Sequence, residues 1–286
     1  MRIKNDLSKL NNSFDEIGVI SEYENKGLSL VEEKIYSKYL SKTEARILDI
    51  GCFVGRVSFP LANKGFRVFG IDISLSAIKR ANELKKNKDN VNFKIASATN
   101  IPFKDETFDY ILFPYNTIEG IPSQQSRINA MKEATRSLKQ NGLILFSAHN
   151  RLYPKYCVGI TINELYKLLL KVLVIFRLDS VLPSKMKKII RENINTEFAS
   201  ILWVEPGGSN FVKWHFSTSK EIKEILKSSS LRLVEKVPVM DHGPQKIHAD
   251  LLRNSRFNFL KAPVFYYICE KATSLREIPR VVSEQF

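Results

Sequence analysis

Short apolar runs alternate with amphipathic stretches through residues 46–147, and this alternation constrains the fold more than any other feature. Each apolar run has the length of a strand that is buried on both faces of a sheet. Strands that alternate with helices form parallel sheets covered on both sides, so we expect a doubly wound α/β fold. The expected strands are 46–50, 66–71, 91–95, 108–113 and 142–147, and the expected helices are 27–41, 56–64, 74–86 and 123–142.

The pattern changes after residue 150 and later returns. Residues 1–26 are polar and irregular, whereas the second half mixes predicted helices and strands. We expect residues 151–216 to be an insertion on the sheet, not a separate domain. The segments expected there are helices 162–178 and 183–194 and strands 198–204 and 211–216, which flank a turn at Pro206–Ser209. The α/β pattern returns with a helix at 218–228 and strands at 231–237 and 264–269.

We therefore divide the chain into one α/β domain with added segments. The expected parts are an N-terminal helical segment (1–43), the α/β core (44–150), an inserted cap (151–216), a return to the core (217–271) and a tail (272–286). Because 44% of the residues are hydrophobic, the composition excludes a disordered chain.

Cysteine content and hydropathy indicate the cellular compartment in which we expect the protein. The 3 cysteines are far apart and provide neither a disulfide framework nor a metal-binding cluster, so we expect no metal. No apolar run reaches the roughly 18 residues of a membrane span, and the N-terminus lacks the apolar stretch of a secretory signal. We expect a cytoplasmic protein.

The chain is basic, with a formal net charge of +14. Residues 151–191 contain 9 Lys or Arg against 2 acidic residues, a cluster that can attract RNA, an acidic substrate or an anionic membrane surface. No nucleic-acid motif accompanies the charge. We therefore favour lysines that solvate the surface, and we rank nucleic acid and membrane contact as weaker alternatives.

A glycine-containing turn follows the first predicted strand. Gly51 and Gly55 lie between strand 46–50 and the next helix, where glycine lets a ligand approach the backbone. The dinucleotide fingerprint GxGxxG is absent, because Phe53 and Arg56 occupy two of its glycine positions. A GxxxxGK[ST] phosphate loop is absent as well. This turn therefore disfavours a pyrophosphate ligand.

An aspartate follows the second predicted strand. Asp72 lies at its carboxyl end, and neighbouring parallel strands place these ends side by side. A carboxylate there can accept hydrogen bonds from both ribose hydroxyls of a nucleoside. Gly51 and Asp72 together indicate a nucleoside pocket without a diphosphate clamp. The alternative is an aspartate that caps the next helix beside a purely structural turn.

These motifs resemble those of the class I S-adenosylmethionine-dependent methyltransferases. The likeness covers residues 44–150 and, more faintly, 217–271. It implies a Rossmann-like, seven-stranded, mostly parallel sheet with S-adenosylmethionine as co-substrate. The matching stretches are Leu48–Arg56 (the glycine-rich first motif), Phe69–Ser74 (the ribose-binding strand), Ala98–Phe103 with Glu106–Tyr110 (the adenine-side loop) and Leu138–Leu143 (the approach to the fifth strand).

The resemblance also implies which residues bind the donor. Asp72 takes the ribose hydroxyls, and the first motif lies under the amino-acid part. Phe53 replaces a usual glycine, and Ser97 replaces a frequent acidic residue, so both departures predict weaker donor binding. The full set of implied donor-binding residues is Asp49, Gly51, Cys52, Gly55, Asp72, Ile73, Ser97, Ala98, Pro114 and Asn116.

Methyl transfer from a sulfonium needs alignment and exclusion of water, and a base helps when the nucleophile is a hydroxyl or ammonium group. His149 follows the fifth strand at the ligand-bearing edge and is the first candidate, before His242 and His215. For each histidine, a structural hydrogen-bonded imidazole is the competing interpretation. Tyr115 is a further catalytic candidate where the methyl group points, and Tyr23 is a candidate to fold over the donor.

The expected function is methylation of oxygen or nitrogen on a small metabolite or sugar-like acceptor, with the cap selecting the acceptor. RNA methylation is the first alternative. It is weakened because residues 112–116 lack the Asn/Asp-Pro-Pro-Tyr run that acts on base amines. A catalytically inactive donor-binding protein is the second alternative, and an NAD dehydrogenase is the weakest. The sequence gives no expectation for the oligomeric state.

Overall fold

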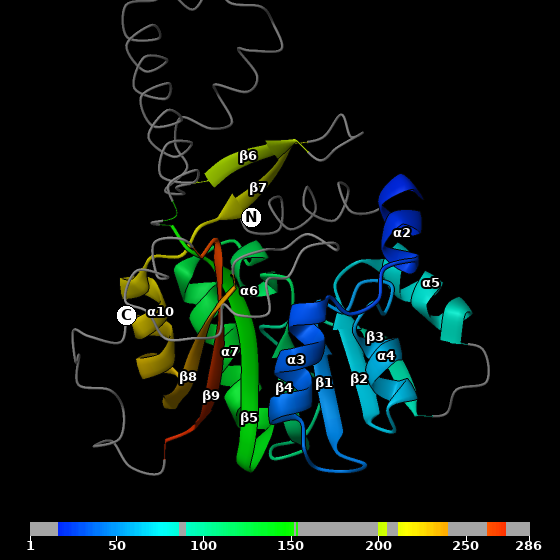
Figure 1. Cartoon of the computed structure of the whole chain (residues 1–286), viewed down its shortest axis with the longest axis horizontal. Helices are drawn as coiled ribbons and strands as arrows, with labels where there is room; N and C mark the ends of the chain where they lie inside the picture. The colour runs from blue at the N-terminus through cyan, green and yellow to red at the C-terminus, as the bar shows by residue number, and fades with distance from the viewer. Residues whose placement is uncertain are drawn as a thin grey trace, which may run out of the picture.

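The computed structural model describes residues 17–85, 90–151, 153, 200–204, 211–239 and 262–272. A seven-stranded sheet with the order β3-β2-β1-β4-β5-β9-β8 forms its centre (Figure 1). β9 pairs antiparallel with both of its neighbours, whereas the pairs from β3 to β5 are parallel. This confirms the predicted mostly parallel α/β fold. The strands are β1 (Arg46–Ile50), β2 (Arg67–Asp72), β3 (Val91–Ile95), β4 (Phe108–Phe113), β5 (Leu138–His149), β8 (Leu231–Val239) and β9 (Val264–Lys271).

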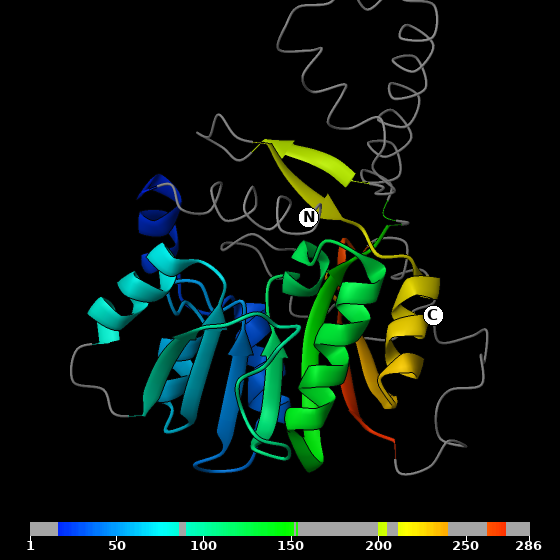
Figure 2. The ribbon, with the colours of Figure 1, turned by 180° about the vertical axis from the view of Figure 1, so that it is seen from behind.

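Helices cover both faces of the sheet. α3 and α4 pack against one hydrophobic cluster, and α7 and α10 pack against the other (Figures 1 and 2). Ser29 and Thr218 begin α3 and α10 with capping boxes, each closed by a glutamate three residues later. The described helices are α2 (Ile17–Glu24), α3 (Leu30–Tyr39), α4 (Ser58–Asn63), α5 (Leu75–Lys85), α6 (Thr117–Gly120), α7 (Gln124–Ser137) and α10 (Ser219–Ser228).

The central strands are buried on both faces, as their apolar sequences predict. All six residues of β4 are buried. In β1, Ile47 belongs to the cluster under α3 and α4, and Leu48 belongs to the cluster under α7 and α10. This alternation joins two cores through one sheet, because successive side chains of a strand point to opposite faces.

A second, two-stranded sheet lies beyond the carboxyl ends of the central strands (Figures 1 and 2). β6 (Ser200–Val204) pairs antiparallel with β7 (Phe211–His215), which confirms the two predicted strands. The predicted turn at 206–209 and the helices at 162–178 and 183–194 lie outside the described residues. Among the helices that the structure describes, none combines the length and apolar character needed to cross a membrane.

Two predictions about secondary structure are wrong. Residues 17–24 form α2 and not an irregular segment. The helix that starts after Ser123 ends at Ser137 and not at 141–142, because Leu138 is fully buried and pairs with Phe108 as the first residue of β5. Asn141 has a φ of 62°, so the Asn-Gly signal marks an irregularity within the strand.

Candidate functional site

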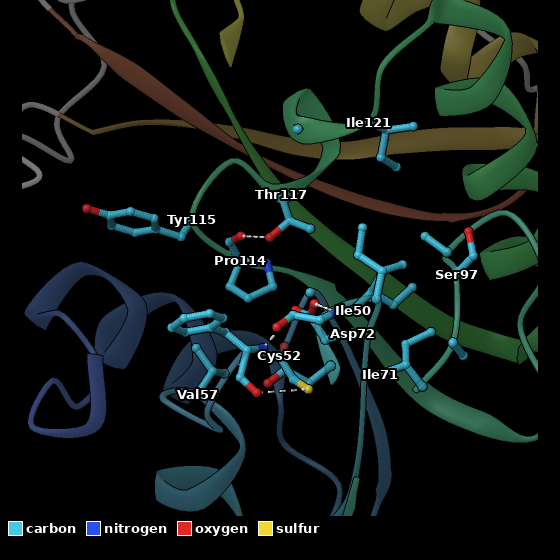
Figure 3. Close-up of a pocket in the computed structure, with 18 of the residues that line it drawn as sticks. Ile50, Cys52, Val57, Ile71, Asp72, Ser97, Pro114, Tyr115, Thr117 and Ile121 are labelled. Carbon is cyan, nitrogen blue, oxygen red and sulfur yellow. Dashed lines mark hydrogen bonds between the residues drawn. The ribbon is translucent and has the colours of Figure 1, made fainter. Parts of the chain in front are cut away.

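A pocket opens at the carboxyl edge of the sheet, where β1 turns toward α4 and β2 turns toward α5 (Figure 3). β1 lies between β2 and β4, so the chain reverses its winding direction here. Ligands of open α/β sheets bind at this point. The lining residues come from α2 (Tyr23), β1 and its turn (Asp49–Phe53, Arg56, Val57), β2 and its turn (Ile71–Ser74), the β3 loop (Ala96–Thr99), the β4 loop (Pro114, Tyr115, Thr117) and the α6–α7 region (Gly120–Pro122, Ser126).

The glycine-rich turn has a left-handed backbone that leaves no room for an added side chain. Gly51 has a φ of 73°, and a Cβ at this residue would lie 2.3 Å from Cγ2 of Thr117. Phe53 has a φ of 50°, so it adopts the backbone conformation that glycine favours. Its side chain adds an aromatic wall to the pocket. Phe53 therefore combines a glycine-like backbone conformation with an aromatic ring in the lining.

Asp72 joins this turn to the end of β2. Oδ2 accepts a hydrogen bond from the backbone N of Phe53 at 2.9 Å, and Oδ1 accepts one from the backbone N of Ser74 at 2.9 Å. The carboxylate lines the pocket and is only partly buried (Figure 3). Each carboxylate oxygen can accept a second hydrogen bond. Asp72 therefore presents a carboxylate to the pocket while it holds the turn.

Asp49 is the most unusual acid in the pocket. It is fully buried, and Oδ2 accepts a hydrogen bond from the Ser58 hydroxyl at 2.6 Å. Oδ1 has no hydrogen-bond partner among the described residues. Burial raises the pKa of the Asp49 carboxyl to about 7, and the contacts with Ser58 and Arg56 lower it only in part. A cationic ligand group beside Oδ1 would complete this site.

Arg56 places a positive group in the same wall. Its guanidinium donates to both carboxylate oxygens of Glu32 at 2.7 and 2.6 Å, and the two side chains are 9% and 2% exposed. Although burial opposes ionisation of Glu32, Arg56 holds the pKa of this carboxyl below its usual value. From the sequence, Arg56 was noted only because it occupies a glycine position of the dinucleotide fingerprint, and its ion pair was not predicted. The bidentate pair fixes a cation beside the pocket and links the turn to α3.

Three aromatic rings line the pocket. The Tyr23 ring makes edge-to-face contacts with Phe53 and Tyr115, with ring centroids 5.4 and 6.0 Å apart. Arg56 lies 5.3 Å from the centroid of the Tyr115 ring. Glu24 pairs with Arg80 of α5 and thereby holds α2 beside this wall. Tyr23 therefore lies in the wall of the pocket. The sequence had suggested this residue as one that folds over the donor.

The opposite side of the pocket is built by small and aliphatic residues. Ile73 and Ala98 line the pocket, and Figure 3 shows Ser97 and Ile121 on the side away from Tyr115. The Ser97 hydroxyl lies 2.9 Å from the Thr99 hydroxyl and accepts a hydrogen bond from the Thr99 backbone N. This side offers apolar surface for a flat ring and hydroxyl groups at its edge.

His149 lies outside the lining of this pocket. Its Nδ1 is 2.6 Å from Oε2 of Glu119, and its Nε2 is 3.1 Å from Nδ2 of Asn116. The predicted donor-binding residue Asn116 is thus directed to His149 and not to the pocket. His215 is buried with Nε2 3.0 Å from Glu221, and His242 lies outside the described residues. The sequence analysis missed Glu119, since a lone glutamate after an apolar strand carries no motif.

Most of the predicted donor-binding residues meet in one pocket. Gly55 does not line it, because a Cβ at Gly55 would lie 2.6 Å from the Phe59 ring, so this glycine serves the packing of the turn. The predicted residues that line the pocket are Asp49, Gly51, Cys52, Asp72, Ile73, Ser97, Ala98, Pro114 and Tyr115.

The chemistry of the lining fits S-adenosylmethionine. The unpaired Oδ1 of Asp49 suits an ammonium group, the Arg56 guanidinium suits a carboxylate, and Asp72 suits ribose hydroxyls.

Comparisons with known proteins agree with this chemistry. A family model described as "Methyltransferase domain" matches residues 41–229. An uncharacterised protein of Methanocaldococcus jannaschii is 27% identical over 82% of this chain and 78% of its own length. The ubiquinone biosynthesis O-methyltransferase of Rickettsia akari is 32% identical over 54% of this chain and 60% of its own length.

Solved structures share the fold. A SAM-dependent methyltransferase of Methanosarcina mazei has a TM-score of 0.56 at 22% identity, covering 84% of this chain and 98% of that one. A Pyrococcus horikoshii protein has a TM-score of 0.53 at 21% identity, covering 84% and 87%. Since the family model spans more than half of the chain, the family is established. The chain belongs to the methyltransferase domain family.

Proposed function

We propose that this protein transfers the methyl group of S-adenosylmethionine to an oxygen or nitrogen atom of a small, largely apolar acceptor. The observation that carries the proposal is the wall formed by Tyr23, Phe53 and Tyr115. Such a wall favours a compact acceptor with an aromatic or aliphatic part, because rings pack well against apolar surface. It favours a sugar less, since a sugar needs many polar partners.

The donor is held in three places in this proposal. Asp49 binds the ammonium group, Arg56 binds the carboxylate, and Asp72 binds the ribose hydroxyls. Ile73, Ser97 and Ala98 lie along the adenine, as the motifs predict. The Asp72 contacts to the backbone of Phe53 and Ser74 support this arrangement, because they fix the turn before a ligand arrives.

The donor supplies an activated methyl group, and the protein aligns the acceptor with it and excludes water. Pro114 and Tyr115 end β4 beside the donor pocket. Thr117 donates its hydroxyl to the carbonyl of Pro114 at 2.5 Å, which fixes the β4 loop (Figure 3). We assign this loop to the acceptor side. The acceptor atom attacks in line with the bond that breaks, and its proton passes to a base.

His149 is the base in this proposal. It lies at the end of β5, outside the lining of the donor pocket and beside Asn116 of the β4 loop. The residues 151–216 select the acceptor as a cap, of which the described part is β6 and β7. Among the relatives, the ubiquinone biosynthesis O-methyltransferase of R. akari and the norajmaline N-methyltransferase of Rauvolfia serpentina support oxygen or nitrogen as the methylated atom.

Two measurements test the proposal. Calorimetric titration with S-adenosylmethionine and with S-adenosylhomocysteine should give saturable binding. Incubation with a methyl-labelled donor should then label compounds from a panel of phenols and amines, with sugars and total RNA as the comparison arms. Label that appears only in RNA, and whose transfer collapses at 0.5 M salt, would replace the small acceptor by a nucleic acid. Binding without any product would indicate an inactive donor-binding protein.

A further inference from the structure

Glu119 collects hydrogen bonds from two distant parts of the chain. Oε2 accepts from the backbone N of His149 at 3.0 Å and lies 2.6 Å from Nδ1 of the same residue. Oε1 accepts from the backbone N of Ser217 at 2.7 Å. The carboxylate is 0% exposed, so these N–H groups take the place of water. Glu119 thus joins the end of β5 to the segment that leaves β7.

The environment of Glu119 explains why a carboxylate is needed. The described hydrogen-bond partners of its carboxylate are N–H groups, which require an acceptor at both oxygens. A glutamine would place its amide N–H₂ against one of these donors. The charged or titratable groups around the cluster are Arg127 of α7, Tyr267 of β9, His215 at the end of β7 and Glu221 of α10.

The contacts of His149 define where its proton resides. Nδ1 faces a carboxylate oxygen, so it carries the hydrogen of that bond. Nε2 faces the amide nitrogen of Asn116, which can only donate, so Nε2 accepts and carries no proton. The ring of Phe216 packs against the imidazole with centroids 4.4 Å apart. The lone pair of Nε2 is therefore directed toward the β4 loop.

Asn116 connects this imidazole to the pocket. It lies between Tyr115 and Thr117, which both line the pocket, and its backbone N donates to the Ser147 hydroxyl at 2.7 Å. Asn116 is 5% exposed, and its Oδ1 has no hydrogen-bond partner in the described part of the chain. Rotation of the amide by half a turn would exchange Nδ2 and Oδ1. Oδ1 would then accept a hydrogen bond from Nε2 of a protonated His149.

We propose that Glu119 and Asn116 are positioning residues for His149. Glu119 keeps the proton on Nδ1, so that Nε2 is the basic atom, and the Asn116 amide turns over when Nε2 takes a proton. This inference rests on the proposed function, because the acceptor of the methyl group is the source of the proton. The acceptor O–H or N–H gives its proton to Nε2 and its lone pair to the methyl carbon. The electron pair of the breaking S–C bond stays on sulfur, and Glu119 balances the imidazolium charge.

The first test reads the tautomer directly by ¹⁵N NMR of the histidine side chains, in the full-length protein saturated with S-adenosylhomocysteine. We expect a protonated Nδ1 and an unprotonated Nε2 for neutral His149. In Glu119→Ala we expect the proton to move to Nε2, the form that a free imidazole side chain prefers in water. An Nε2–H tautomer in the unaltered protein would overturn the proposal without any variant, so a variant that fails to fold does not block the test.

The second test separates positioning from folding. Glu119→Gln should lower kcat at least about tenfold, while the Kd of S-adenosylhomocysteine stays unchanged. Glu221→Gln is the matched control, since it removes the carboxylate from the other described histidine pair and keeps a residue that can close the capping box. We expect Glu221→Gln to leave the His149 tautomer and kcat unchanged. Equal losses of kcat in both variants would contradict a specific role of Glu119.

The two proposals fail in different ways. An absence of donor binding in calorimetry, together with the Nδ1–H tautomer, would overturn the proposed function and leave the positioning of His149 intact. Normal turnover in Glu119→Gln with normal donor binding would overturn the positioning role and leave the methyltransferase proposal intact.

Discussion

The two ends of the ligand-bearing edge of the sheet are built in different ways. The donor pocket lies over β1 and β2 and takes its polar groups from strand ends and from the turns that follow them. The Glu119 cluster, formed by Asn116, Glu119, His149 and Ser217, lies over β4 and β5 and includes a hydrogen bond between residues 98 positions apart. Figure 1 shows the second end beneath β7. The polar groups of the donor pocket come from successive strand ends and turns, whereas the cluster depends on the return of the chain from β6 and β7.

This difference predicts where each region is vulnerable. The donor pocket contains a buried ion pair and an acid with an unpaired oxygen, so its stability and its ligand affinity depend on charge. The cluster is held by N–H donors around one carboxylate, so its stability depends on the direction of these hydrogen bonds. Changes of charge in the donor pocket should leave the His149 tautomer untouched. A variant that alters both regions would show that they act as one unit.

The largest expected effect is a loss of unfolding free energy in Arg56→Ala. The change leaves the Glu32 carboxylate buried without its bidentate partner, which costs about 3–5 kcal/mol of unfolding free energy. Denaturant titration measures the loss. Arg80→Ala is the control, because its ion pair with Glu24 is partly exposed and screened by solvent, so the loss of stability should be much smaller. Similar losses in the two variants would show that burial of the Arg56 pair is unimportant.

A smaller effect is expected from Asp72→Ala. The variant removes two charge-assisted hydrogen bonds to the ribose, so donor affinity should fall at least tenfold, or about 1.4 kcal/mol. Calorimetry measures the change. Asp105→Ala removes an exposed carboxylate and should leave the affinity unchanged. An unchanged affinity in Asp72→Ala would mean that another residue holds the ribose.

A pH dependence of donor binding follows from Asp49. Its pKa is raised to about 7 by burial, so the folded chain keeps a proton that the unfolded chain loses near pH 4. This term favours folding below pH 4 and is lost as pH rises to 7. The donor ammonium needs the ionised carboxylate. Affinity should therefore rise up to about tenfold per pH unit below 7 and level off above it.

Asp49→Asn provides the check on this pH dependence. The variant should bind the donor more weakly and show a flat affinity between pH 5.5 and 7, a range in which the donor amine stays charged. Methylthioadenosine lacks the ammonium group, so its affinity should be flat even in the unaltered protein. A slope that persists in Asp49→Asn would assign the titration to another group.

Much of the fold could be predicted from the sequence. The parallel core follows from apolar runs such as Phe108–Phe113, because strands buried on both faces leave no polar alternation. The end of the helix after Ser123 could not be predicted, since Asn141-Gly142 is a strong local stop signal. The burial of Leu138 beside Phe108 overrides that signal, and only the tertiary structure reveals it.

The residues of the candidate site, too, were predicted from the sequence only in part. Gly51 and Asp72 were found because strand ends in a parallel sheet converge, so position along the chain implies position in space, and Asp49 was implied by the family resemblance. Arg56 and Glu119 were missed. Arg56 is paired by Glu32 of α3, and Glu119 is paired by donors from β5 and from Ser217, and no spacing along the chain encodes either contact.

The smallest effect is expected at Tyr23, which ties α2 to the wall of the donor pocket. Tyr23→Leu removes edge-to-face contacts with Phe53 and Tyr115, which contribute about 0.5–1.5 kcal/mol for such a pair. The donor should dissociate several-fold faster, as stopped-flow displacement measures. Tyr23→Phe keeps the ring and should dissociate at the normal rate. If Tyr23→Phe behaves like Tyr23→Leu, the hydroxyl and not the ring retains the donor. If Tyr23→Leu changes the His149 tautomer, α2 reaches the Glu119 cluster as well, and the separation between the two regions fails.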